Sequence, residues 1–88
     1  QLKRADDAEA AFRRALAADP DGARAHHGLA RALLAQRRDL DALHAGLDAV
    51  ARLYFFPEAH YHLGVAMTRL GWADRAAEAF GVCLAQAP

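Results

Sequence analysis

Length, composition and charge already exclude several classes of protein. The chain has 88 residues, of which 55% are apolar, and its eleven basic and eleven acidic side chains give zero net charge. Zero net charge argues against non-specific nucleic-acid binding, which needs a basic face, and no apolar run is long enough for a transmembrane helix. The single cysteine, Cys83, cannot form an internal disulfide, so the fold does not depend on an oxidising compartment.

Helix-forming residues dominate the composition. Ala, Leu and Arg are abundant, and the only β-branched residues are Val50, Val65, Val82 and Thr68. Ala, Leu and Arg rank among the best helix formers. The sequence therefore predicts an all-α fold, in which nearly every apolar side chain must be buried to offset the conformational entropy lost on folding.

Residues 1–22 predict a helix followed by a turn. Ala8 and Phe12 are four positions apart and lie on one helical stripe, which continues at Leu16. Residues 19–22 (Asp-Pro-Asp-Gly) have the composition of a turn and should end the helix.

Residues 23–56 predict two helices joined by a short turn. The stripe of the first helix includes Leu29 and Leu33, and the second helix begins after the candidate N-cap Asp39. Gly46 lies inside the second helix, where glycine costs about 1 kcal/mol relative to alanine. We expect either a bend at Gly46 or a bulky neighbour that fills the notch, and the aromatic run before Pro57 is the candidate.

Residues 57–88 predict a second pair of helices. Leu63 and Met67 share one stripe of the first helix, and Gly71 separates it from the next. Small residues recur along both helices and allow them to approach closely. We expect Phe80 to fill the space between this pair and its neighbour.

This last stretch resembles the tetratricopeptide repeat, a helix–turn–helix unit of about 34 residues. The family pattern is Trp-x2-Leu-Gly-x2-Tyr, then Ala-x3-Phe, then Pro. The residues that match it outright are Leu63, Gly64, Ala76, Phe80 and Pro88. His60 and Met67 stand in the Trp and Tyr positions. The middle stretch departs further from the pattern, because Gly46 replaces the phenylalanine and Tyr54 the proline.

The resemblance implies antiparallel helix-hairpin repeats stacked as a right-handed α-solenoid of about five helices. Residues 1–22 would be the second helix of a truncated repeat, and residues 23–56 and 57–88 would be two further repeats. Because the chain starts on Gln1 and lacks that first helix, we expect a fragment of a larger protein. High Ala, Arg and Leu usage favours a bacterial source, and we expect a cytoplasmic location.

The sequence carries no pattern typical of an enzyme. It has no glycine-rich phosphate loop and no serine, and the resemblance places Cys83 in a small-residue position, where a buried inert thiol is expected. His26, His27, His60 and His62 lack the i, i+4 spacing of a helical ligand pair. We expect half-buried structural histidines, with no metal or other cofactor.

In the resembled family, partners bind in the concave groove lined by the first helix of each repeat. The expected groove residues are Arg24, His27, Arg31, Tyr61, His62 and Arg69. This face is basic with one aromatic side chain, and Gly28 should leave a notch in it. Such a surface suits an acidic or C-terminal peptide segment held by arginine forks and tyrosine stacking. The same side chains also fit an ordinary solvated helix face.

Two functions remain open. One is a protein–protein interaction scaffold that binds a peptide of its partner, without nucleic acid or membrane. The other is a structural or self-association module appended to a larger protein, which could be an enzyme. For the second, we expect a homodimer in which a helix of one copy covers the open solenoid end of another.

The helical spacings also predict which side chains are buried. We expect ten of them to form one continuous core: Phe12, Leu16, Leu29, Leu33, Leu43, Leu47, Leu63, Met67, Phe80 and Leu84.

Overall fold

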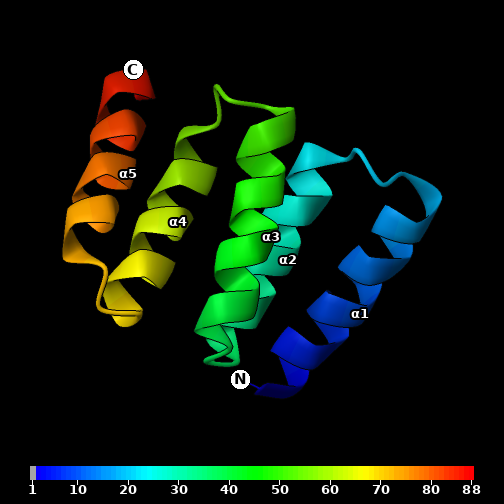
Figure 1. The fold of residues 1–88 in the computed structure, drawn as a ribbon. Coiled ribbons are helices and arrows are strands. Elements are labelled where there is room, and N and C mark those ends of the chain that lie inside the picture. Colours follow the sequence, from blue (N-terminus) through cyan, green and yellow to red (C-terminus); the bar gives the residue numbers. More distant parts are fainter. Residues whose placement is uncertain (1) are drawn as a thin grey trace.

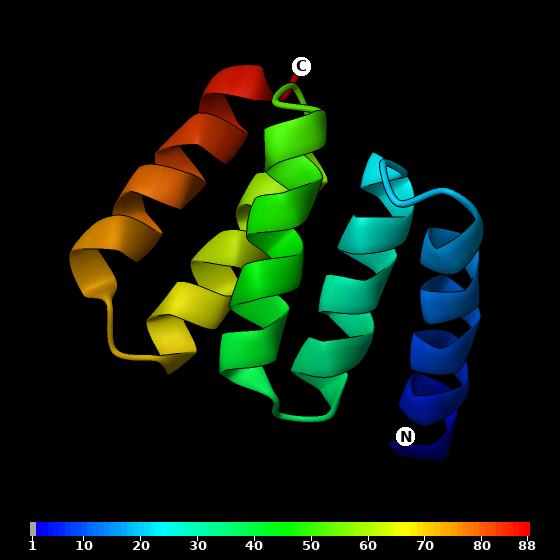
Figure 2. The same cartoon turned by 45° about the vertical axis from the view of Figure 1, so that its right-hand side comes forward.

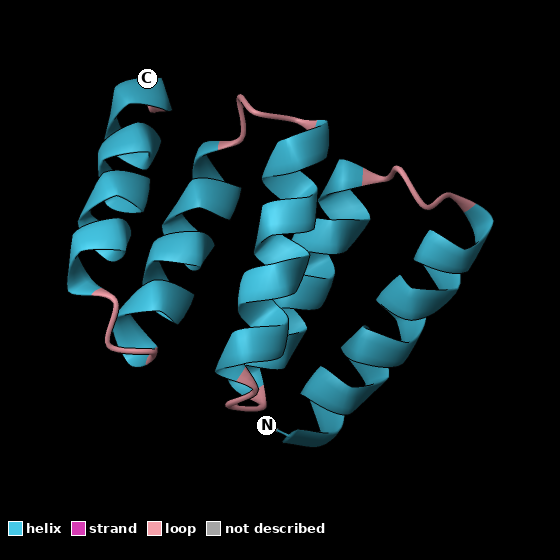
Figure 3. Ribbon diagram, viewed as in Figure 1, coloured by secondary structure: helices cyan, strands magenta, loops and turns pink. Residues whose placement is uncertain are grey.

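Five helices account for most of the chain. The computed structural model describes residues 2–88, and it contains no strand within them. The helices are α1 (Leu2–Ala18), α2 (Ala23–Ala35), α3 (Asp39–Arg52), α4 (Pro57–Arg69) and α5 (Ala73–Gln86). Short loops connect them (Figures 1 and 3). The predicted all-α fold, with helix hairpins stacked as an α-solenoid, is confirmed.

The helices form two layers. α2 pairs with α3, α4 pairs with α5, and α1 packs on α2 (Figures 1 and 2). α4 contacts both α3 and α2, whereas no two of α1, α3 and α5 come into contact in the described part of the chain. One layer therefore contains α2 and α4, and the other contains α1, α3 and α5.

The main core lies where α2, α3 and α4 meet. Leu33 is only 1% exposed and is the largest side chain that is fully buried. Its buried neighbours are Leu29, Ala30, Leu34, Ala42, Leu43, Ala45, Leu63, Ala66 and Ala79. Phe12, Leu16 and Met67 pack against this cluster and are partly buried. The alanines bring the helices close together, so the few leucines at the centre provide most of the buried area.

Three of the ten predicted core residues lie elsewhere. Leu47 is 45% exposed and Leu84 is 76% exposed, so their prediction as core residues is wrong. Both lie in the layer of α1, α3 and α5, whose described helices do not pack closely against one another. Phe80 is partly buried outside the main cluster, where its ring packs on Gly64 and lies 5.8 Å from the ring of Tyr61.

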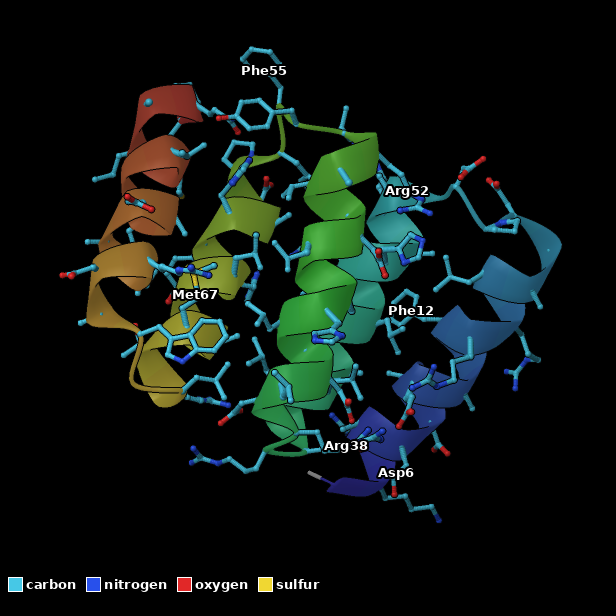
Figure 4. All side chains as sticks on the ribbon, viewed as in Figure 1. Asp6, Phe12, Arg38, Arg52, Phe55 and Met67 are labelled. Carbon is cyan, nitrogen blue, oxygen red and sulfur yellow. The ribbon has the colours of Figure 1, made fainter. Side chains whose placement is uncertain are left out.

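Two glycines allow phenylalanine rings to contact the helix backbone. A Cβ atom on Gly28 would lie 2.3 Å from Cζ of Phe12, and one on Gly64 would lie 2.5 Å from Cε1 of Phe80. These distances are well inside van der Waals contact, so any larger residue would displace the rings. The ring of Phe12 fills the space directly over Gly28 (Phe12 is labelled in Figure 4), and both residues line a hollow of about 400 Å³ between α1 and α2.

The notch at Gly46 is filled from the following helix pair. A Cβ atom on Gly46 would lie 2.9 Å from Cδ2 of Leu63, so Leu63 of α4 occupies the space left by the missing side chain. Filling by the aromatic run at residues 54–56 is wrong. Tyr54 and Phe55 are exposed, and Phe56 is buried in a separate cluster with Ala49 and Ala59.

The turns within the two hairpins have the same backbone geometry but different residues. Arg37 has φ +61° and Gly71, 34 positions later, has φ +82°. In each turn the next amide donates back into the helix, from Arg38 N–H to the Leu33 carbonyl (3.0 Å) and from Trp72 N–H to the Met67 carbonyl (2.8 Å). This is the Schellman helix end, which favours glycine at the left-handed position.

Arg37→Gly should therefore stabilise the protein. Relieving the left-handed strain of an arginine, less the extra entropy of glycine, should raise the free energy of unfolding by about 0.5–1 kcal/mol. Thermal unfolding should show a melting temperature about 4 °C higher. Gly71→Ala is the matched control and should destabilise. A lower melting temperature for Arg37→Gly would contradict the strain argument.

Candidate functional site

Five of the six expected groove residues are neighbours on α2 and α4. Arg24, His27 and Arg31 project from α2, and Tyr61 and His62 project from α4. We call the surface that carries these five residues the α2–α4 face. Arg24, Arg31 and Tyr61 are exposed, whereas His27 is buried at 9% exposure and His62 is partly buried.

A histidine pair joins the two helices at the centre of this face. Nε2 of His27 lies 2.9 Å from Nδ1 of His62, although the residues are 35 positions apart. Nδ1 of His62 also lies 2.8 Å from the backbone carbonyl oxygen of Glu58. A carbonyl can only accept, so Nδ1 of His62 carries the hydrogen, and it is shared between Glu58 and Nε2 of His27.

This arrangement assigns different protonation behaviour to the two rings. Nε2 of His27 must act as an acceptor, which places its hydrogen on Nδ1. Protonation of His27 at Nε2 would place a second N–H opposite the N–H of His62, and the hydrogen bond between the two rings would break. Protonation of His62 at its free Nε2 leaves both bonds intact. The face can therefore gain one positive charge at His62 while His27 stays neutral.

Phe56 supports the histidine pair from beneath. Its ring is 5% exposed and meets the ring of His27 edge-on at 4.8 Å, and the guanidinium of Arg24 lies 5.5 Å from the centre of the Phe56 ring. Burial, together with the nearby charges of His62 and Arg31, lowers the pKa of His27 to about 4. Burial also lowers the pKa of His62 below its usual value.

These lowered pKa values predict acid sensitivity. An unfolded chain binds a proton at His27 near pH 6.5, whereas the folded chain does so only near pH 4, so stability is full above pH 6.5 and falls as the pH drops through this window. The loss from His27 should be about 2 kcal/mol, because the ring keeps some exposure. Urea unfolding at several pH values measures it. His27→Leu should remove this part of the pH dependence, and His44→Gln on the exposed face of α3 should not.

Arg31 and Tyr61 are the exposed groups beside the histidine pair. Arg31 makes no ion pair within residues 2–88. Tyr61 is 48% exposed, and its ring stands edge-on to His62 at 5.1 Å. A free guanidinium and an exposed phenol thus flank the one position that can acquire charge.

Arg69 stands apart from the other five residues. Its guanidinium donates to the backbone carbonyl of Leu34 at 2.8 Å and to Oδ1 of Asp39 at 3.3 Å. It therefore connects the end of α4 to the end of α2 and the start of α3. Its side chain has a structural partner already and does not extend over the α2–α4 face.

His26 and His60 hold backbone turns. Nε2 of His26 donates to the carbonyl of Pro20, and Nε2 of His60 donates to the carbonyl of Tyr54, each at 2.8 Å. The two donors are 34 positions apart, and so are the two acceptors. The same hydrogen bond therefore recurs in both repeats. Within residues 2–88, no three metal-ligating side chains gather at one point.

Two glutamines that the sequence does not single out tie the loops to the helices. Gln86 of α5 accepts from the amide of Phe56 and donates to the carbonyl of Tyr54, both at 2.9 Å. Gln36 donates to Glu9 of α1 at 2.9 Å, and this bond, with that from Arg13, lowers the pKa of Glu9 to about 2. Neither glutamine has a sequence signal, because its partners are backbone groups or lie on a distant helix.

Comparison with known proteins places the fold in a family. The sequence model described as "Tetratricopeptide repeat" matches residues 1–45, about half of the chain. A search of curated proteins gives no match. No helix among the described residues is long and apolar enough to cross a bilayer. The match, the hairpin repeats and the 34-residue equivalences agree, and the chain belongs to the tetratricopeptide repeat family.

Proposed function

We propose that the chain is an interaction scaffold that binds an acidic peptide segment of a partner protein on the α2–α4 face. Repeats of this family generally mediate protein–protein interaction. The observation that carries the proposal is the exposed Arg31 and Tyr61 on either side of the His27–His62 pair. The proposal assigns this surface the role of the concave groove expected from the sequence.

The chemistry of the face favours a carboxylate ligand. The guanidinium of Arg31 can bind a carboxylate through two parallel hydrogen bonds, and Tyr61 offers a flat ring with a polar tip. The free Nε2 of His62 becomes a donor when it is protonated, and a nearby carboxylate favours that form. An acidic segment therefore satisfies all three groups together.

The remaining parts of the proposal follow the family. We propose that residues 1–22 contribute the second helix of one repeat, and that residues 23–56 and 57–88 form two further repeats. The role is binding rather than catalysis, in the cytoplasm of a bacterium. A second candidate role is self-association through the ends of the solenoid, which the 76% exposure of Leu84 on α5 favours.

Arg31→Glu should abolish most of the affinity for an acidic peptide. A labelled peptide of alternating Glu and Ala residues, titrated by fluorescence anisotropy, should bind the variant at least about tenfold more weakly. Binding to the wild type should also weaken as salt is raised. Arg14→Glu, which changes the same charge on an exposed position of α1, is the matched control and should bind as the wild type does. Equal affinity of all three proteins would contradict the proposal.

A further inference from the structure

Two grooves in the outer layer are equivalent by the repeat. One lies between α1 and α3 over a floor of α2, with a volume of about 340 Å³. The other lies between α3 and α5 over a floor of α4, with a volume of about 470 Å³. Each residue that lines the second groove follows a residue of the first by 34 positions. We call them the α1–α3 groove and the α3–α5 groove.

The walls of the two grooves differ in chemistry at the same positions. The α1–α3 groove has Arg13 and Asp48 where the α3–α5 groove has Leu47 and Val82. Arg13 forms an ion pair with Glu9 at 2.8 Å, so this wall of the α1–α3 groove is polar and compatible with contact with water. In the α3–α5 groove these two positions are uncharged, and Leu47 is 45% exposed. The α3–α5 groove is thus an open apolar surface, and its equivalent in the same chain is not.

The floor and the far end of the α3–α5 groove continue the apolar surface. Met67 and Val50 are partly buried there (Met67 is labelled in Figure 4). Arg75, which lines the groove, lies over the ring of Trp72 at 5.7 Å, and Trp72 is 39% exposed. An apolar surface that combines the exposed Leu47 and Trp72 with the partly buried Met67 is more typical of an association surface than of a solvated one.

The charges on the rim of this groove are of both signs and have no ion-pair partner among residues 2–88. Arg75 and Glu78 lie three positions apart on α5, and neither makes an ion pair with any described residue. At the equivalent position of the other groove, Asp41 is paired with Arg38 at 3.1 Å. A positive and a negative side chain one helical turn apart form a self-complementary pattern, since an antiparallel copy presents them in the opposite order.

We propose that the α3–α5 groove is the contact between two copies of this chain, with their α5 helices antiparallel. A two-fold contact pairs residue i with j and j with i, so Arg75 of each copy meets Glu78 of the other. Leu47 and Val82 are buried between the copies. Zero net charge removes overall repulsion between them. This contact is independent of the α2–α4 face and leaves the peptide site open.

A charge exchange tests the reciprocal pairing. Sedimentation equilibrium of the 88-residue chain should show a monomer–dimer equilibrium. Arg75→Glu alone and Glu78→Arg alone should each raise the dimer dissociation constant about tenfold, because like charges then meet at both ends of the contact. An equimolar mixture of the two single variants should restore dimerisation, because each mixed pair again joins opposite charges. A mixture that stays as weak as its components would overturn the proposal.

Leucine variants locate the contact. Leu47→Glu should raise the dissociation constant at least tenfold while circular dichroism shows unchanged helix content, since Leu47 lies outside the core. Leu84→Glu, at the exposed C-terminal side of α5, should leave the dimer intact. Loss of the dimer with Leu84→Glu but not with Leu47→Glu would place the contact at the solenoid end and overturn the proposal. So would a wild type that is monomeric up to millimolar concentration.

Discussion

Leu33→Ala is expected to lower the free energy of unfolding by about 4 kcal/mol. Leu33 is 1% exposed in the cluster that joins α2, α3 and α4, and truncating a leucine in such a site leaves a cavity that the surrounding helices fill only in part. This loss is a large share of the free energy of unfolding of a small domain, which is about 5–10 kcal/mol. Urea unfolding followed by circular dichroism measures the loss.

Leu47→Ala is the matched control for this prediction. Helical spacing predicts both leucines to be buried, but Leu47 is 45% exposed. Its truncation should lower the free energy of unfolding by less than about 1 kcal/mol, because it removes little buried apolar surface. Similar losses for Leu33→Ala and Leu47→Ala would show that the core is not centred on Leu33.

Phe56→Ala should lower the free energy of unfolding by about 3 kcal/mol and disturb the α2–α4 face. The ring of Phe56 is buried against Ala49, Ala59 and the ring of His27, so its removal leaves a cavity under the histidine pair. Water reaching that cavity should raise the pKa of His27 from about 4 toward its ordinary 6.5. Thermal unfolding measures the first effect, and an NMR titration of the histidine ring protons measures the second.

The neighbouring Phe55→Ala is the control. Phe55 is 77% exposed and points away from the helices (Figure 4). Its truncation should change stability by less than about 0.5 kcal/mol and leave the pKa of His27 unchanged. If the two variants behaved alike, Phe56 would not support the site.

The helices were predictable from the sequence because their signals are local. Turn residues such as Gly71 and the stripe of Leu29 and Leu33 depend only on neighbours within one or two turns. Whether another helix covers a given apolar stripe depends on residues far away in the sequence. Leu47 and Leu84 have the spacing of core residues, but their exposure depends on how closely the helices of the outer layer pack together, and the described helices of that layer stay apart.

The site was predictable only as a set of residues on one face. The repeat pattern places His27 and His62 on the first helices of two repeats, but their 2.9 Å contact depends on how closely α4 packs against α2. The same packing takes Arg69 away from the face and gives it Leu34 as a partner. Such pairings, about 35 positions apart, leave no periodic signal in the sequence.

Amide chemical shifts can show where an acidic peptide binds on the folded chain. Titrating the Glu-Ala peptide into the ¹⁵N-labelled protein should shift the amides around Arg31, Tyr61 and His62, with smaller changes in α1 and α5. Arg31→Glu should remove these shifts. Shifts confined to α1, α3 and α5, or no shifts at all, would contradict binding on the α2–α4 face.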